Sequence, residues 1–462
     1  MKATRSLRRL VLVLVLGMAL LPLVGPVSPV AAQAPTVIYV NDDAAGANNG
    51  TNWADAYRDL ETALTAAGSP TSANPVEIWV AAGTYTPTRL MQDGYARSAT
   101  FTLKSNVALY GGFAGNEASR ENRDWQANET ILSGDIGSPE DTLDNTYHVV
   151  SALSDTDSTT ILDGFYVRYG YSAWTGENYP YFPNVNPDCG GGLYVNAGSP
   201  TVRNVIFRSN IGVAGAGMYV ASGSPTLTNV TFQANRAVLE QNRNKGDGGG
   251  GLYLDSGTGT VLLTDVSFLG NEGRGLDILG GGMLVRGGNV TLNNAVFLGN
   301  YAYYGGGMYV RGGIVTLNNA TFHGNRTAWN GAAMANYGGS VALTNSIVWG
   351  NLSGMNTWQI YGSHTVTYSS LEDVCSPTLE DCTGVISSDP MFVGPVNPYS
   401  APTPYGDLHL NRTDRIIGTP VWDTGNNAAV TVSTDRDGNP RIVNGAVDMG
   451  AYETQDTAGP TG

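Results

Sequence analysis

A unit of about 25 residues recurs along the middle of the chain, and this period constrains the fold more than any other feature. Each unit opens with two or three small residues before an apolar one, continues through a Thr-rich segment, and ends on Phe-x-x-Asn or an apolar equivalent. The opening apolar residues are Leu193, Met218, Leu252, Met283, Met308 and Met334, separated by 25, 34, 31, 25 and 26 residues. The closing asparagines are Asn210, Asn235, Asn271, Asn300, Asn325 and Asn351.

The Thr-rich segments have the pattern of strands. In Val290-Thr291-Leu292-Asn293, apolar and polar residues alternate, so one face is expected to be buried and the other wet. A single unit cannot bury its own apolar face, whereas stacked units form a continuous core and pair each strand with both neighbours. The sequence therefore predicts an all-β fold, a right-handed parallel β-helix.

A second column of Asn or Asp stands three residues before each Phe or its Val equivalent. Stacked amides can form hydrogen bonds along the axis, and Asn tolerates the left-handed backbone of a sharp corner. We expect both Asn columns to be structural, as we do the Gly clusters at the corners. The second column consists of Asn204, Asn229, Asp265, Asn294, Asn319 and Asn345.

The N-terminus has the features of a secretory leader. Lys2, Arg5, Arg8 and Arg9 precede an apolar run from Leu10 to Leu21, and small residues follow up to Ala32. This order predicts a signal peptide over residues 1–32 and a secreted protein, extracellular or at the cell surface. After the leader, no apolar stretch reaches the roughly 20 residues that a membrane-spanning helix needs. We expect no transmembrane segment in the mature chain.

The mature chain divides by its pattern into four parts. Residues 33–110 are interpreted as an N-terminal cap and first coils, with a short capping helix within 53–67 because Trp53, Tyr57, Leu60 and Leu64 recur at helical spacing. Strand-like runs occupy 76–80, 101–110, 147–151 and 160–167. Residues 111–355 are the β-helix repeats, 356–455 hold decayed final coils and a distinct C-terminal region, and 456–462 are a flexible tail. Within the decayed part, 389–393 and 407–410 still look strand-like.

Short motifs outside the repeat resemble a known family. Ala82-Gly83-Thr84-Tyr85, Leu162-Asp163-Gly164-Phe165 and the repeats themselves are similar to those of bacterial secreted β-helix proteins related to polymorphic outer-membrane proteins. The segments 435–441 and 447–453 resemble the terminal region called a choice-of-anchor domain. The resemblance implies a pectin-lyase-like fold and an extracellular setting, but it brings no shared catalytic residues.

The net charge limits the classes of ligand that the chain can bind, and the cysteines bear on its disulfide bonds. The formal net charge of −15 disfavours binding to nucleic acid or anionic lipid. Cys375 and Cys382 enclose a short loop in a chain expected to meet an oxidising compartment, so we predict a disulfide between them. Cys189 is then left as a thiol, which we expect to be buried.

The charged residues after two of the closing asparagines are the candidates for catalysis. A glycosidase needs two carboxyl groups about 5 to 9 Å apart, and a lyase needs a basic residue. The weak catalytic candidates are Lys245, Asp247, Glu272, Arg274 and Asp277, with solvated loop charges as the alternative.

Aromatic residues gather along the same edge and can stack on sugar rings or anchor a protein partner. The ligand-binding candidates are Tyr171, Trp174, Tyr179, Tyr181, Tyr303, Tyr304 and Trp329. A second stripe, Tyr194, Tyr219, Tyr253 and Tyr309, should point outward. For both sets the alternative is that the rings pack on one another or under the edge loops.

One segment has the spacing that opens a calcium loop. Asp435, Asp437 and Asn439 alternate, but Ala446 stands where an EF-hand has its Glu, so a full EF-hand is excluded. A weak calcium site or a plain Asx-rich turn remains. Apart from this calcium, no cofactor is expected.

Three functions compete on these observations. The first is a non-catalytic secreted or cell-surface β-helix that contacts a polysaccharide, a cell-surface glycan or a protein partner through its aromatic edge. The second is a polysaccharide lyase or glycoside hydrolase acting from the edge insertions. The third is a structural component of a surface layer.

Overall fold

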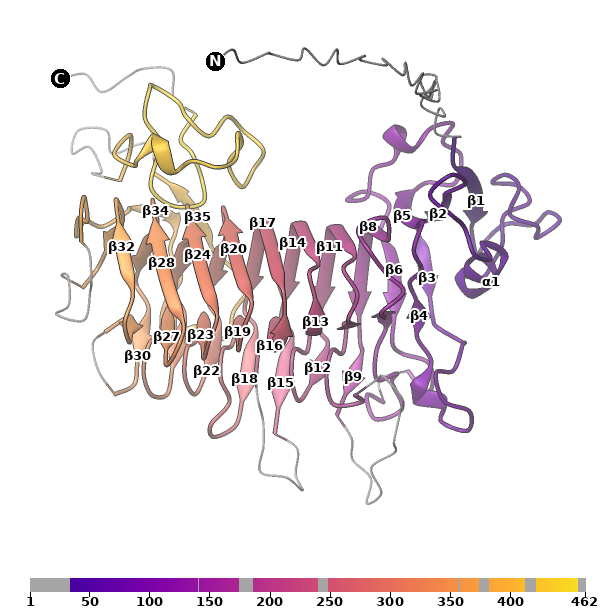
Figure 1. Cartoon of the computed structure of the whole chain (residues 1–462), viewed down its shortest axis with the longest axis horizontal. Helices are drawn as coiled ribbons and strands as arrows, with labels where there is room; N and C mark the ends of the chain where they lie inside the picture. The colour runs from indigo at the N-terminus through magenta and orange to yellow at the C-terminus, as the bar shows by residue number, and fades with distance from the viewer. Residues whose placement is uncertain are drawn as a thin grey trace, which may run out of the picture.

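The strands of the protein stack side by side along one long axis (Figure 1). The computed structural model describes residues 34–139, 141–173, 186–239, 248–355, 358–373, 382–411 and 421–455. Within these residues three parallel sheets run along the axis and form the walls of a β-solenoid. In the same part of the chain, no helix is long and apolar enough to cross a membrane.

The largest wall, sheet 1, contains the Thr-rich strands. Its strands are β1 (Thr36–Val40), β2 (Val76–Ala81), β3 (Gly83–Tyr85), β5 (Val107–Phe113), β6 (Thr130–Ser133), β8 (Ile161–Arg168), β11 (Thr201–Arg208), β14 (Thr226–Gln233), β17 (Thr260–Leu269), β20 (Asn289–Asn293), β21 (Val296–Leu298), β24 (Ile314–Asn318), β25 (Thr321–His323), β28 (Ser340–Thr344), β29 (Ile347–Trp349), β32 (Thr365–Thr367) and β33 (Ser370–Leu371). Equivalent residues of successive units pair directly, as Phe207 does with Phe232 and Phe232 with Phe268. The sequence period therefore becomes the register of the sheet.

The other two walls are formed by shorter strands. Sheet 2 begins at the small-residue openings and consists of β4 (Phe101–Thr102), β7 (Val150–Ala152), β10 (Leu193–Asn196), β13 (Met218–Gly223), β16 (Leu252–Thr258), β19 (Met283–Val285), β23 (Met308–Val310), β27 (Met334–Asn336) and β31 (Ile360–Tyr361). Sheet 3 begins directly after the closing asparagines and consists of β9 (Tyr171–Ser172), β12 (Ile211–Gly212), β15 (Arg236–Val238), β18 (Glu272–Arg274), β22 (Tyr301–Ala302), β26 (Arg326–Thr327) and β30 (Leu352–Ser353).

The interior of the solenoid is a continuous apolar column. The five Phe residues of the repeat, from Phe207 to Phe322, are fully buried and stack with ring centroids 4.4–5.1 Å apart. The opening Leu and Met residues are fully buried in the same cluster. The apolar residues of each unit thus point into the interior and the alternating polar residues point outward, as the sequence predicts, because successive residues of a strand point to opposite faces.

The closing asparagines form a ladder along the inside of the corner between sheets 1 and 3. Asn235 Nδ2 donates to Asn271 Oδ1, and Asn271 Nδ2 donates to Asn300 Oδ1, each at 3.0 Å. The same amides also donate to backbone carbonyls, as Asn300 Nδ2 does to Phe268 O at 2.9 Å. Every buried amide of the ladder is therefore paired, which confirms its predicted structural role.

The second Asn column occupies backbone corners. Its six residues have φ between 51° and 57°, a left-handed conformation that Asn and Asp tolerate better than other side chains do. Asn229 Nδ2 donates to Asn204 Oδ1 at 2.8 Å, so part of this column also links neighbouring coils. At the Gly corners, Gly280 and Gly305 have φ of 64° and 60°, and a Cβ there would lie within 2.3 Å of a carbonyl oxygen.

A short helix covers the N-terminal end, as predicted, but it is smaller than the helical spacing suggests. Helix α1 (Leu60–Ala66) is capped at its N-terminus by Asp59, whose carboxylate accepts hydrogen bonds from the Glu61 and Thr62 amides. Trp53 and Tyr57 precede it: Tyr57 pairs with strand β1, and Trp53 packs against Tyr39 with centroids 4.9 Å apart. The predicted strand over 101–110 is likewise two strands, β4 and β5, because the chain turns a corner between them at Asn106 (φ 58°).

The decayed region keeps one more coil, formed by β31, β32 and β33, and then departs from the stack. Strand β35 (Asp407–Leu410) matches the strand-like run 407–410, whereas β34 (Phe392–Gly394) overlaps the run 389–393 only at its end. The two strands form an antiparallel hairpin instead of coils. Their connection, residues 395–406, is named the hairpin loop below.

The terminal segment, residues 421–455, folds back over the outer face of sheet 1 (Figure 1, yellow). Met449 and Ala451 pack against Val296, Leu298 and Ile347, whose side chains point away from the solenoid interior. Gly450 N donates to Asn345 O at 2.7 Å, and Asn294 and Asn345 of the corner column donate to the carbonyls of Thr434 and Asn426. This part of sheet 1 is therefore covered, whereas the outer face of sheet 3 and its corner with sheet 2 carry the candidate residues for ligand contact.

Candidate ligand-binding surface

Three of the predicted binding residues meet at the corner between sheets 3 and 2. Tyr303 and Tyr304 follow β22, and Trp329 follows β26 of the next coil, where its amide donates to Tyr303 O at 3.0 Å. The Tyr303 and Trp329 rings are stacked with centroids 6.0 Å apart, and Tyr304 lies edge-on to Tyr303 at 5.0 Å. All three rings are half-buried. The stacking of coils thus converts three positions of the repeat into one cluster.

The cluster continues onto the sheet 2 side through rings that the sequence analysis did not select. Tyr337 lies 5.9 Å from Tyr304, 5.3 Å from Tyr309 and 5.1 Å from Tyr361, measured between ring centroids. Tyr337 is 46% exposed and the nearby Trp358 is 40% exposed. Tyr303, Tyr304, Trp329, Tyr337, Trp358 and Tyr361 are named the aromatic surface below. Tyr337 follows β27, Trp358 precedes β31 and Tyr361 ends it, in a part of the chain where the repeat is already weak.

A pocket of about 520 Å³ opens beside the exposed rings. Tyr337, Trp358 and Tyr361 line it together with Ser363 and the backbone of neighbouring glycines. Asn336 fixes one wall, because its Oδ1 accepts from the amides of Gly338 and Gly339 and its Nδ2 donates to Ser363 O. The pocket combines flat apolar rings with polar backbone groups, a lining that suits a sugar ring.

The outward Tyr stripe of sheet 2 is accounted for by packing. Tyr194, Tyr219 and Tyr253 align in register and point outward as predicted, but they are at most 8% exposed. Their ring centroids lie 5.8 and 5.0 Å apart, and Tyr219 donates to the Asp255 carboxylate. Burial raises the pKa of Tyr309, the last Tyr of the stripe, to about 12. For this stripe the packing alternative holds.

The remaining aromatic candidates lie away from this corner or outside the described residues. Tyr171 is on β9, where the Arg97 guanidinium lies 5.4 Å from its ring centroid and donates to its carbonyl oxygen. Trp174, Tyr179 and Tyr181 lie outside the described residues.

The charged candidates do not form one cluster in the described chain. Glu272 and Arg274 are strand residues of β18 and not loop residues, and Asp277 lies at an exposed corner with φ of 65°. No ion pair connects these three residues within the described ranges, and Lys245 and Asp247 lie outside them. Glu272 instead lies next to Arg236, its register partner on β15. The sequence could have shown this pair, since both residues directly follow a closing Asn.

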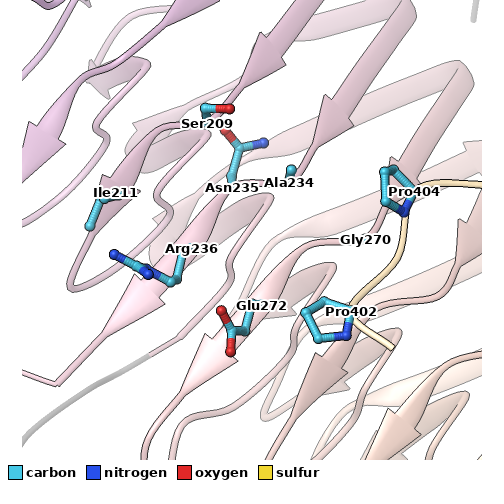
Figure 2. A pocket seen from close by; sticks show the side chains of 9 residues that line it. All are labelled: Ser209, Ile211, Ala234, Asn235, Arg236, Gly270, Glu272, Pro402 and Pro404. Atoms are coloured by element: carbon cyan, nitrogen blue, oxygen red, sulfur yellow. The ribbon is translucent and has the colours of Figure 1, made fainter. Parts of the chain in front are cut away.

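Arg236 and Glu272 line a groove of about 330 Å³ between sheet 3 and the hairpin loop (Figure 2). Pro402 and Pro404 form its wall on the loop side, and Ile211 lies at the opposite end of the lining (Figure 2). The groove is shallow and combines one cation, one carboxylate and apolar walls.

The proposed calcium loop is a tight turn. Asp435 is 1% exposed, its Oδ1 accepts from the amides of Asp437 and Asn439, and its Oδ2 accepts from the Glu453 amide. The Asp437 carboxylate contacts His409. These contacts are those of an Asx-rich turn, the alternative left open by the spacing.

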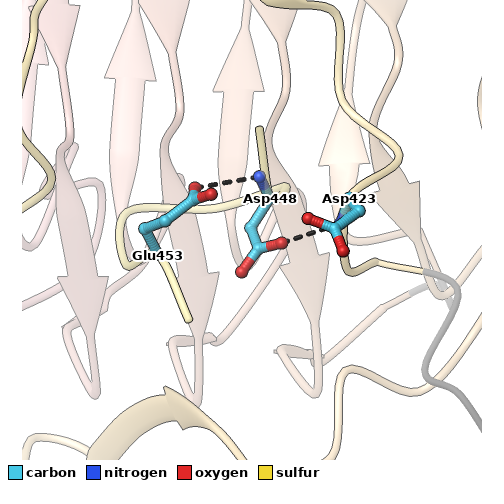
Figure 3. Close-up of side chains that lie close together, drawn as sticks. All are labelled: Asp423, Asp448 and Glu453. Atoms are coloured by element: carbon cyan, nitrogen blue, oxygen red, sulfur yellow. Dashed lines mark hydrogen bonds between the residues drawn. The ribbon is translucent and has the colours of Figure 1, made fainter. Parts of the chain in front are cut away.

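A second group of carboxylates lies in the same terminal segment as this turn. Asp423, Asp448 and Glu453 bring oxygens within 4.8 Å of one another (Figure 3). Asp448 accepts from the amides of Asp423 and Thr454, and Glu453 accepts from the amides of Asp448 and Val443. Burial raises the pKa of Asp448, and burial together with Asp448 raises the pKa of Glu453 to about 8. Although carboxylate oxygens suit a hard cation, backbone donors already engage these groups, and we interpret them as structural.

Of the cysteines, Cys189 is a buried thiol, as predicted, and Cys382 is disulfide-bonded. Cys375, the predicted partner of Cys382, lies outside the described residues.

Comparison with known proteins agrees with the stacked parallel strands. A family model described as a right-handed β-helix region matches residues 162–346. The fold is a right-handed parallel β-helix. A solved pectate lyase structure, Pel9A, is similar at 16% identity and a TM-score of 0.45, over 91% of this chain and 96% of that chain. No curated protein matches the chain. The resemblance to polymorphic outer-membrane proteins and to a choice-of-anchor region stays a prediction.

Proposed function

We propose that this β-helix is a secreted, non-catalytic protein that binds glycans through its aromatic surface. The observation that carries the proposal is the stacked Tyr303–Trp329 pair beside a pocket lined by Tyr337, Trp358 and Tyr361. Sugar rings present flat faces of C–H groups, which pack on aromatic rings, while their hydroxyls reach polar groups at the rim.

Packing within the protein explains the neighbouring Tyr309 but not the exposed rings of the aromatic surface. Tyr309 is 7% exposed and is accounted for by its neighbours, whereas Tyr337 and Trp358 are each at least 40% exposed next to a pocket. Exposed apolar rings that adjoin one another are characteristic of interaction sites. The acidic charge of the chain disfavours nucleic acid and anionic membranes as the ligand.

The test is a panel of soluble polysaccharides on the purified mature protein, assayed for binding and for released products with and without calcium. We expect binding without product release. Trp329→Ala and Tyr337→Ala should each weaken binding about tenfold, the effect of removing one aromatic contact at the centre of a binding site. Trp125→Ala is the matched control, because Trp125 is half-buried at the N-terminal end and packs near Tyr166.

Two outcomes would contradict the proposal. Product release that is lost in Glu272→Ala would make the protein an enzyme acting from the edge. Equal loss of binding in the Trp125→Ala control would show that the aromatic substitutions act through stability and not through contact.

A further inference from the structure

The groove under the hairpin loop is held in place by contacts to several coils. Thr403 N donates to Gly299 O at 2.9 Å, and Val396 N donates to the buried His323 Nε2 at 2.9 Å. At Gly270 and Gly299 the loop backbone approaches so closely that a Cβ would lie 2.6 Å from Pro404 N and 2.2 Å from Thr403 O. These contacts fix Pro402 and Pro404 over sheet 3, so the groove is a built feature of the fold.

The two charged residues of the groove are both available to a ligand. Arg236 and Glu272 occupy the same register position in neighbouring coils, yet no ion pair joins them among the described residues. The Arg236 Nε atom is buried, and no described residue forms a hydrogen bond with it. The Arg236 side chain nevertheless lines the groove, so its guanidinium can donate to a ligand oxygen there.

The balance of charges selects a class of ligand. A uronate carboxylate would meet the Arg236 guanidinium but would be repelled by Glu272, and an amine would have the opposite difficulty. The hydroxyls of a neutral sugar both donate and accept, so they match a carboxylate that only accepts and a guanidinium that only donates. Pro402, Pro404 and Ile211 offer apolar surface to the C–H face of the same ring.

Sheet 3 connects the groove to the aromatic surface. The outward positions of sheet 3 pair in the order Arg236, Glu272, Tyr301 and Arg326, and Tyr303 follows two residues after Tyr301. The Arg326 guanidinium lies 5.8 Å from the ring centroids of both Tyr301 and Tyr399. Neighbouring coils are about 4.8 Å apart, so a short oligosaccharide lying along the axis spans both sites.

We infer that the groove formed by Arg236, Glu272, Pro402 and Pro404 is a second subsite for the same glycan and accepts a neutral sugar residue. This inference rests on the proposed function, which it deepens by naming the ligand class.

The test compares calorimetric binding of soluble gluco-, manno- and xylo-oligosaccharides with that of oligogalacturonate. The intact mature protein should prefer a neutral oligosaccharide. Glu272→Gln and Arg236→Gln should each reduce its affinity about tenfold, because each removes hydrogen bonds to a charged group. Arg208→Gln, which introduces the residue that Gln233 provides in the next coil, and Glu121→Gln, at an exposed site, are the matched controls.

The outcomes separate the two proposals. Unchanged affinity in Glu272→Gln and Arg236→Gln, or a preference for oligogalacturonate, would overturn the subsite while a loss in Trp329→Ala still supported the aromatic surface. Loss in the groove variants with unchanged Trp329→Ala would overturn the aromatic surface and keep the groove. Absence of binding to every oligosaccharide by the unaltered protein would overturn both.

Discussion

The Nε2 atom of His409 lies 2.6 Å from the Oδ2 atom of Asp437, which connects the β34–β35 hairpin to the terminal segment. On the other side of the ring, His409 Nδ1 lies 2.5 Å from Asp407 Oδ1, and the ring packs on Tyr452 with centroids 4.2 Å apart. Partial burial alone would lower the pKa of His409, but the hydrogen bonds and charges of Asp437 and Asp407 raise it above 6.5. Burial, the largest single effect, would raise the pKa of Asp407, but the hydrogen bonds from the His409 amide and ring, together with the His409 charge, lower it below 3.8.

This contact predicts a pH-dependent contribution to stability. Since the folded pKa of His409 is raised, its contribution is complete below pH 6.5 and is lost as the pH rises through the folded pKa. On the acid side, the lowered pKa of Asp407 means that its contribution holds above pH 3.8 and is lost as the pH falls. His409→Gln should therefore cost about 0.5 kcal/mol at pH 5.5, a value set by the half-exposed position, and less at pH 9. Urea unfolding of both proteins at these pH values measures it, and a pH-independent difference would contradict it.

The Phe column predicts a large effect at its centre. Phe297 is fully buried between Phe268 and Phe322, with centroids 4.6 and 4.4 Å away. Phe297→Ala should lower the free energy of unfolding by about 3–5 kcal/mol, because it removes apolar contact and leaves a cavity. Phe297→Leu, the control, keeps more of the volume and should cost less than half as much. Denaturant unfolding distinguishes them, and equal losses would argue against a packing effect.

The Asn ladder predicts that loss of a buried hydrogen-bond acceptor also lowers the free energy of unfolding. Asn300 Oδ1 accepts from both the backbone amide and the side chain of Asn271, so Asn300→Ala leaves two buried donors unpaired. The expected loss is about 2–4 kcal/mol of unfolding free energy. Asn289→Ala, at the exposed start of β20, should change it by less than about 0.5 kcal/mol. Comparable losses at the two positions would show that the ladder adds nothing beyond strand propensity.

Replacement of the buried Glu61 by a neutral residue is predicted to stabilise the folded protein. The side chain is 6% exposed, and its buried Oε1 atom forms no hydrogen bond within the described part of the chain. Burial, with a further effect of Asp59, raises its pKa to about 7. The folded state therefore loses stability as the pH rises from 4.5 to about 7, because over this interval the carboxyl ionises in the unfolded chain but stays protonated in the fold. The thermal midpoint of Glu61→Gln should rise relative to the unaltered protein over this interval and stay higher above it. Asp93→Asn, on an exposed loop, should show no such trend, and a difference that narrows with pH would contradict the prediction.

The candidate site was predictable only where the repeat itself placed its residues. Tyr303, Tyr304 and Trp329 fall at related positions of successive units, and the structure brings them together. Tyr337 and Trp358 were missed because they stand where the repeat weakens. Arg236 was missed as the neighbour of Glu272, although both residues directly follow a closing Asn and therefore share one position of the repeat.

By itself, the sequence determined the coil period, the inward residues and both Asn columns. These features depend on alternation within a strand and on repetition between units, and both are visible along the chain. Only the tertiary structure decided that the terminal segment covers sheet 1 and that the hairpin loop encloses the groove. Arg436 reaches Asn229 over 207 residues and Ala451 reaches Thr321 over 130, and contacts at such separations leave no periodic signal in the sequence. Their positions follow from side-chain packing on the finished solenoid, which exists only after the coils have stacked.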